Sequence, residues 1–144
     1  MPSADLIISE ARTWVGVPWR HQGMTRVGVD CGGLILAVGL GAGVLNEGMR
    51  ADPRLKKFAS YGREPVGDFL EACDIFFDQT EEELEPGMVV AMRFMGHPRH
   101  AGIVGSHPSG GLSLIHAYQK SVVEHILDAR WRKRIVARYR WRDV

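Results

Sequence analysis

Five short segments rich in β-forming residues follow Pro86-Gly87, and they limit the possible folds more than any other feature of the sequence. Glycine, proline and serine separate them, which is the pattern of strands joined by turns. The segments are Met88 to Phe94, His100 to Gly105, Leu112 to Ala117, Val122 to Leu127 and Ile135 to Trp141. They predict an antiparallel sheet. Alternation within the last segment favours an edge strand with exposed arginines.

Helical patterns occupy the chain before these segments. Residues 3 to 15 begin with Ser3, a plausible N-cap, and predict an amphipathic helix that ends at Gly16. A nearly continuous apolar run from Leu34 to Leu40 predicts a buried helix capped by Asp30, and Phe69 to Phe77 predicts another short helix. Helices first and strands afterwards indicate an α+β fold, with N-terminal helices packed on a sheet of about five or six strands.

Length and hydropathy limit the organisation of the protein. A chain of 144 residues is near the commonest domain size, so we expect one domain over 1–144. No stretch reaches the roughly 18 consecutive apolar residues of a membrane span, and the first residues lack the pattern of a secretory signal. We therefore expect synthesis in the cytoplasm without a signal peptide, and no membrane partner.

Charge is divided between two blocks although the formal net charge is only +1. Residues 64–85 contain nine acidic side chains and no Lys or Arg, whereas the last fifteen residues are rich in arginine. An arginine-rich end can bind nucleic acid, but charge blocks are more often solvated faces, and these two could face each other across the fold. We predict no nucleic-acid partner; duplex binding that weakens steeply with salt would contradict this.

Cys31 is the candidate nucleophile. The two cysteines, Cys31 and Cys73, are too far apart in sequence to indicate a disulfide framework, and they lack the paired spacing of a structural zinc site. Cys31 falls in the first turn of the predicted buried helix, where the thiol pKa is lowered and backbone N–H groups can stabilise an oxyanion. A free cysteine is more often a buried apolar residue, which suits Cys73 among its apolar neighbours.

A cysteine nucleophile needs an imidazole that the fold brings close, and a third polar group that orients it. Six histidines compete for these roles, and His100 and His116 lie within predicted strands. The others, among them His21 and His125, are expected to be structural or to line the substrate. No metal or organic cofactor is predicted.

Several motifs together resemble the NlpC-type cell-wall cysteine peptidases in order and spacing, over nearly the whole chain. The loop Pro18-Trp19-Arg20-His21-Gln22-Gly23 is most similar to the branch found in bacteriophage tails and gene transfer agents. The motifs are Gly16-Val17-Pro18-Trp19, Val29-Asp30-Cys31-Gly32-Gly33-Leu34-Ile35, Pro86-Gly87-Met88-Val89-Val90, His100-Ala101-Gly102-Ile103-Val104 and Ile115-His116-Ala117.

The resemblance implies a circularly permuted papain-like fold and hydrolysis of peptidoglycan stem peptides, within a phage tail or gene transfer agent particle. It implies Cys31 as nucleophile, His100 as base and His116 as the orienting residue. Residues expected at the substrate or the oxyanion are Trp19, His21, Asp30 and Gly32.

Three residues depart from the family pattern: Gly32 replaces a usual serine, Trp19 a usual tyrosine and Met88 a common aspartate. Glycine preserves the turn, whereas Trp19 keeps an aromatic wall but lacks the phenolic hydroxyl. Two alternatives stay open. One is an amidase or acyltransferase that uses the same Cys-His pair on another substrate, and the other is a tail-tip structural subunit with a weak or vestigial site.

Overall fold

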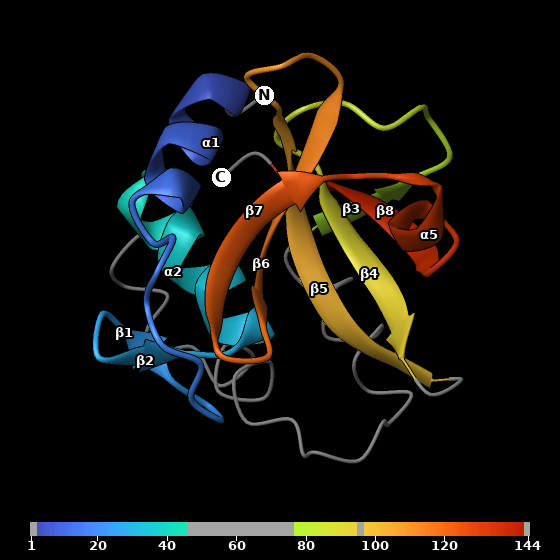
Figure 1. Cartoon of the computed structure of the whole chain (residues 1–144). Helices are drawn as coiled ribbons and strands as arrows, with labels where there is room; N and C mark the ends of the chain where they lie inside the picture. The colour runs from blue at the N-terminus through green and yellow to red at the C-terminus, as the bar shows by residue number, and fades with distance from the viewer. Residues whose placement is uncertain (1–2, 46–76, 95–96, 143–144) are drawn as a thin grey trace.

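The computed structural model describes residues 3–45, 77–94 and 97–142, which form helices packed on an antiparallel sheet (Figure 1). Its elements are α1 (Ala4–Arg12), β1 (Met24–Thr25), β2 (Gly28–Val29), α2 (Cys31–Gly41), β3 (Phe77–Thr80), β4 (Val89–Phe94), β5 (His97–Ser106), β6 (Leu112–Tyr118), β7 (Ser121–Ile126), α5 (Ala129–Arg132) and β8 (Ile135–Trp141). The helix expected over 69–77 lies outside the described residues, except that Phe77 begins β3. No helix in the described parts of the chain is long and apolar enough to cross a membrane.

The main sheet has six strands in the order β3-β8-β4-β5-β6-β7, and each neighbouring pair is antiparallel. Strands β4 to β7 follow one another in sequence and in space, so they form a meander within the predicted antiparallel sheet. Strand β8 then returns to the other side of β4. The predicted α+β fold, with helices on an antiparallel sheet of five or six strands, is therefore confirmed.

The prediction that Ile135 to Trp141 is an edge strand is wrong. Strand β8 lies inside the sheet, between β4 and β3, and Arg138 and Arg140 pair with Thr80 and Asp78 of β3. Strand β3 is short and its sequence, Phe-Asp-Gln-Thr, falls within the acidic run, so it carries little of the β-branched and aromatic signal of a strand. The partner that makes β8 an interior strand was therefore not recognised.

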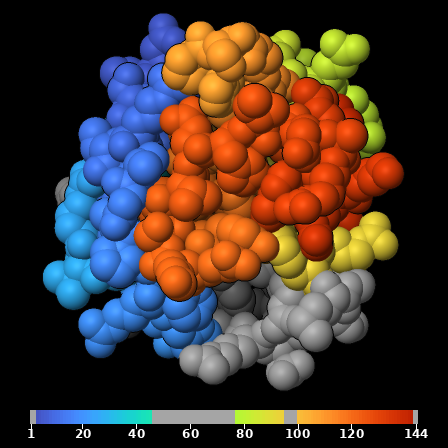
Figure 2. All heavy atoms as spheres, in the orientation of Figure 1, coloured from blue at the N-terminus to red at the C-terminus, as the bar shows by residue number. Residues whose placement is uncertain are grey.

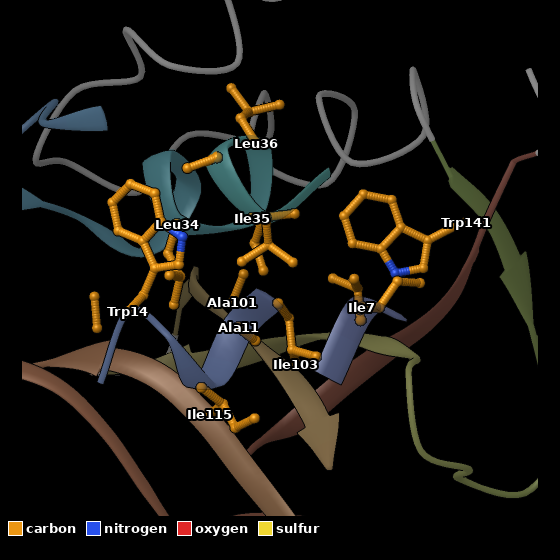
Figure 3. Close-up of a cluster of buried hydrophobic side chains, with 14 of the residues drawn as sticks. Ile7, Ala11, Trp14, Leu34, Ile35, Leu36, Ala101, Ile103, Ile115 and Trp141 are labelled. Carbon is orange, nitrogen blue, oxygen red and sulfur yellow. The ribbon is translucent and has the colours of Figure 1, made fainter. Parts of the chain in front are cut away.

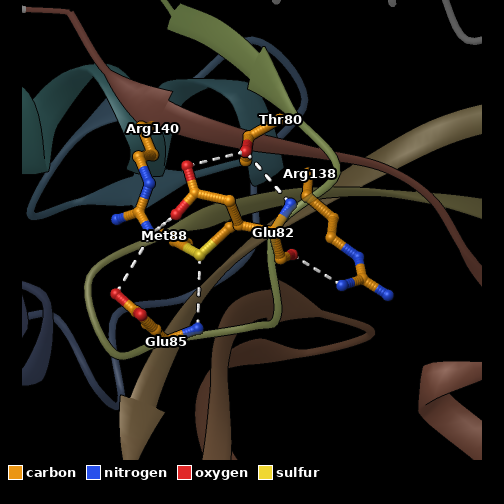
Figure 4. Close-up of polar contacts among 6 residues, drawn as sticks. All are labelled: Thr80, Glu82, Glu85, Met88, Arg138 and Arg140. Carbon is orange, nitrogen blue, oxygen red and sulfur yellow. Dashed lines mark hydrogen bonds and ion pairs between the residues drawn. The ribbon is translucent and has the colours of Figure 1, made fainter.

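The two charge blocks meet beside this part of the sheet. The Arg140 guanidinium lies 2.9 Å from Glu82 and 3.1 Å from Glu85 (Figure 4). Arg142 pairs with Asp78 at 3.1 Å. The Arg138 guanidinium donates to the backbone carbonyl of Glu82. Arg140 and Arg142 are thus paired with acidic side chains, as the interpretation that the two charge blocks face each other predicted. Pairs with an exposed carboxylate contribute little stability.

Hydrophobic side chains cover both faces of the sheet. On one face α1 and α2 pack side by side, and their Ile7, Ala11, Leu34 and Ile35 share a core cluster with alternate residues of β5 and β6 (Figure 3). The opposite face carries a second cluster that includes Val104, Leu114 and, from α5, Trp131. Neighbouring strand residues therefore face different surroundings, because side chains alternate between the two faces of a sheet.

Leu34 and Leu6 offer a matched test of this core, since both are helical leucines. Leu34 is completely buried in the α2 side of the core, whereas Leu6 of α1 is 59% exposed. Leu34→Ala is expected to lower the free energy of unfolding by about 2–5 kcal/mol through lost burial and the cavity left behind. Leu6→Ala is expected to change it by less than about 0.5 kcal/mol. Urea denaturation measures both, and equal losses would contradict the packing described here.

Candidate active site

Cys31 is the first residue of α2 and is almost completely buried. Asp30 caps the helix, and its Oδ1 accepts a hydrogen bond from the Gly33 N–H at 2.7 Å. The other carboxylate oxygen accepts from the Gln22 N–H, also at 2.7 Å, so one side chain joins the preceding loop to the helix. Burial raises the Asp30 pKa, and these two N–H donors oppose that shift. The predicted cap is confirmed, and it fixes the position of the neighbouring thiol.

The backbone N–H groups of Gly33 and Gly32 differ in whether they are available to donate a hydrogen bond to an oxyanion. The Gly33 N–H is already engaged by Asp30, so it is not the oxyanion donor in this structure. A side chain at Gly33 would collide with the carbonyl oxygen of Gly23, which explains the second glycine by packing between loop and helix. Gly32, buried in the same turn, is left as the predicted oxyanion residue.

Trp19 and His21 lie in the loop that leads to Cys31. Their rings stack with centroids 6.4 Å apart, and Trp19 is 39% exposed, an unusual exposure for so large an aromatic ring. The Trp19 N–H donates to the carbonyl of Lys120 at 2.9 Å, and Trp19 also pairs with Val29. This loop therefore ties the start of α2 to the turn between β6 and β7.

The histidines form a hydrogen-bonded chain across three strands. His100 on β5 places its Nε2 2.6 Å from Nδ1 of His116 on β6. The other ring nitrogen of His116 lies 2.8 Å from Nε2 of His125 on β7, and His125 Nδ1 lies 2.9 Å from the carbonyl oxygen of Ile126. His116 is completely buried and His100 nearly so. The structure thus brings together the two histidines singled out in the sequence and adds a third.

The imidazoles lie on the α5 side of the sheet. Their strand neighbours Ala101 and Ile115 belong to the core under α1 and α2, whereas the His116 ring lies 4.9 Å from that of Trp131 in α5. Atoms of β7 and α5, orange to red, cover this side in the space-filling view (Figure 2). Cys31 begins a helix that packs on the other side of β5 and β6.

The thiol and the imidazoles nevertheless belong to the same end of the sheet. The ring of His100 lies 6.2 Å from that of Tyr118, the last residue of β6. The turn after Tyr118 contains Lys120, which holds the loop leading to Cys31. A substrate bound at this end would lie near Trp19, the start of α2 and His100, the first residue of the histidine chain.

Burial makes His100 and His116 weak bases in the resting protein. The pKa of His100 is lowered to about 3, mainly by desolvation and further by the positive charge of Arg134. The pKa of His116 is lowered to about 2, again by desolvation first and then by His100 and His125. Both rings are therefore neutral at neutral pH. His100 starts as an imidazole able to accept a proton rather than as an imidazolium.

These shifts predict that the fold loses stability in mild acid. Because both folded pKa values lie below the ordinary value of 6.5, the unfolded chain binds more protons as the pH falls from 6.5 towards 3. The stabilisation is fully present above pH 6.5. Between pH 6.5 and 5 we expect the free energy of unfolding to fall by about 1–2 kcal/mol for each histidine that stays neutral.

Urea denaturation at pH 7.5 and 5.0 measures this loss. The double variant His100→Gln/His116→Gln is the control, since it removes both groups and is expected to lose most of the pH dependence. A wild-type protein equally stable at the two pH values would show that the imidazoles are not buried in neutral form.

The sequence predicted His125 to be structural or to line the substrate, and not to belong to a histidine chain. It also did not identify the aromatic rings around the chain. Tyr118 stacks on His116 with ring centroids 5.2 Å apart, and Trp131 lies 5.0 Å from His125. Tyr118 follows His116 by two residues and so shares its face, a signal present in the sequence. The contribution of His125 depends on the pairing of β6 with β7, where it stands opposite Leu114.

The same arrangement of elements occurs in solved NlpC/p60 domains. The NlpC/p60 domain of the peptidoglycan hydrolase SagA superposes with a TM-score of 0.60 at 19% identity, over 96% of this chain and 98% of that one. A Staphylococcus aureus protein of the NLP/P60 family, described as similar to lipoprotein, gives a TM-score of 0.61 at 19% identity. The match covers 96% of this chain and 41% of that one. A Bacillus cereus NlpC/P60 family protein gives a TM-score of 0.62 at 18% identity, over 97% of this chain and 40% of that one.

The chain thus spans nearly the full SagA domain but only about two fifths of the other two chains. No family model matches the sequence, and no curated protein matches it. At these identities the likeness concerns the fold alone: helices packed on one face of an antiparallel meander. The chain therefore has the α+β, papain-like fold of the NlpC/p60 domains.

Proposed function

We propose that this chain is a cysteine peptidase that hydrolyses stem-peptide bonds of bacterial peptidoglycan. The observation that carries the proposal is the hydrogen-bonded pair of His100 and His116 at the sheet end to which the loop before Cys31 is tied. The fold shared with the domain of the peptidoglycan hydrolase SagA supports the choice of substrate.

In the proposed reaction Cys31 Sγ attacks the carbonyl carbon of the scissile peptide bond while its proton passes to Nδ1 of His100. Nδ1 is the ring nitrogen that His116 does not engage. The proposal thus requires Sγ to reach Nδ1 around the end of the sheet. Backbone N–H groups at the start of α2, that of Gly32 among them, stabilise the oxyanion.

Collapse of the tetrahedral intermediate breaks the C–N bond, and the His100 imidazolium gives its proton to the leaving amine. Water then attacks the thioester while neutral His100 takes up a proton from it. The C–S bond breaks, the acid product leaves and Cys31 recovers its proton. Because His100 is desolvated, its imidazolium is a strong acid, which favours protonation of the amine.

Digestion of defined muropeptides, followed by mass analysis, tests this function. Cleavage between residues of the stem peptide, lost in Cys31→Ser, is the expected result. Cleavage of simple amides or transfer of acyl groups, with intact stem peptides, would favour the amidase or acyltransferase alternative. No turnover of any of these substrates would favour the structural subunit.

We propose on the resemblance of the loop from Pro18 to Gly23 that the enzyme acts within a phage tail or gene transfer agent particle. Such a setting would bring the enzyme to the wall. The expected result is that the protein co-purifies with tail proteins. Recovery only as a free secreted lysin would contradict this setting without affecting the proposed chemistry.

A further inference from the structure

His125 is the last histidine of the hydrogen-bonded chain, and its outer partner is a backbone carbonyl oxygen, which can act only as an acceptor. Its Nδ1 lies 2.9 Å from the backbone carbonyl oxygen of Ile126, and a carbonyl oxygen can only accept. Nδ1 of His125 must therefore carry a hydrogen. In the neutral ring the second nitrogen, Nε2, is then an acceptor.

This one proton determines the others along the chain. His125 Nε2 accepts, so His116 Nε2, 2.8 Å away, must be the donor. The neutral His116 ring then presents Nδ1 as an acceptor, and His100 Nε2 donates to it at 2.6 Å. His100 is left with its lone pair on Nδ1. That is the tautomer a base needs if Nδ1 is to take the thiol proton.

We propose that His125 is a positioning residue that sets the tautomers of His116 and His100, so that His100 presents a basic Nδ1 to Cys31. The inference rests on the proposed function for its catalytic meaning. The assignment of hydrogen to Nδ1 of His125 and to Nε2 of His116 and His100 does not depend on that function. His125 acts through His116, whose Nε2 lies 2.8 Å from its own Nε2.

The reverse order of protons is disfavoured by the same contacts. It would place an unprotonated Nδ1 of His125 against the Ile126 carbonyl, so that two acceptors faced each other at 2.9 Å. Water cannot easily replace a lost partner at His116, because this ring is completely buried. Tyr118 and Trp131 pack on the ring of His116 and limit its rotation.

The close approach of the three imidazole rings is not explained by a metal ion that they share. His116 uses Nδ1 toward His100 and Nε2 toward His125, so its two partners lie on opposite edges of one ring. Nitrogens bound to one tetrahedral zinc are separated by about 3.3 Å, given bonds of about 2.0–2.1 Å. Separations of 2.6 and 2.8 Å are those of direct hydrogen bonds.

Imidazole ¹⁵N NMR of the whole protein at neutral pH tests the proton order without any substrate. The expected wild-type spectrum shows hydrogen on Nε2 of both His100 and His116, and on Nδ1 of His125. Hydrogen on Nδ1 of His100 would overturn the proposal, whatever the enzyme does. Because this measurement needs no turnover, it stands even if the proposed substrate proves wrong.

Variants of His125 connect the protons to the reaction. His125→Leu removes the acceptor, so His116 is expected to lose its preference for Nε2–H, and kcat is expected to fall by at least about tenfold with little change in KM. His125→Gln offers a side-chain oxygen near the position of Nε2 and is expected to restore both the tautomers and most of kcat. His107→Leu is the matched control, since the His107 side chain hydrogen-bonds to Ser109 within its own turn.

A purely structural role for His125 predicts another pattern. In that case the Leu variant would keep the wild-type tautomers of His100 and His116, and Gln would rescue activity no better than Leu. Either result would overturn the proposal. If His125→Leu fails to fold, the wild-type spectrum and the Gln variant still decide it.

Discussion

Cys31→Ser is expected to lower kcat/KM for stem-peptide hydrolysis by at least about 10³-fold, to near the limit of detection. A serine hydroxyl fits the same space at the start of α2, but it is a far weaker nucleophile than sulfur when a neutral imidazole is its base. The Asp30 cap does not depend on the sulfur, so the fold is expected to survive. Mass analysis of muropeptide digests measures the loss, and circular dichroism checks the fold.

Cys73→Ser is the control for this substitution, because it makes the same chemical change at the cysteine that the sequence predicts to be structural. It is expected to keep hydrolysis near the wild-type rate, because the proposed reaction does not use Cys73. The nucleophile assignment is wrong if Cys31→Ser keeps its activity, and it must move to Cys73 if only the second variant is inactive.

His100→Ala is expected to lower kcat/KM by about 10²–10⁴-fold, the range for loss of a general base. The effect is large because His100 accepts the thiol proton, protonates the leaving amine and activates the water. It also leaves His116 Nδ1 without its donor inside the fold. Initial rates on a fluorogenic stem peptide measure the loss.

His107→Ala is the control for this loss, since it removes a half-buried histidine whose side chain bonds to Ser109 within its own turn. Urea denaturation of both variants separates catalysis from folding. If His100→Ala is folded and nearly as active as His107→Ala, then His100 is not the base, and the arrangement of His100 with His116 is only structural.

The sequence predicted the elements that have strong local patterns. The helix that starts at Cys31 was marked by a capping residue and an apolar run, and the β-rich segments after Pro86-Gly87 by turn residues between them. The position of β8 within the sheet was not predictable in this way. It depends on pairing with β3, whose four residues carry almost no strand signal.

The same limit applied to the site. His100 and His116 stood out because each interrupts or opens an apolar strand, but the electrostatics followed only from the packed fold. The low pKa of His100 arises from burial and from Arg134, which lies over the Phe94 ring that contacts His100. The role of His125 arises from the register of β6 and β7 and from a single carbonyl oxygen. Such long-range contacts leave no local pattern.

The most direct test of the central claim is to trap the acyl-enzyme on Cys31. An activated ester of a stem peptide is mixed with the protein, the reaction is quenched with acid within the first turnover, and the digest is mapped by mass spectrometry. A thioester on the peptide that contains Cys31, absent in Cys31→Ser and strongly reduced in His100→Ala, is the predicted result. Release of product with no adduct on Cys31, at a rate that neither substitution changes, would contradict the assignment.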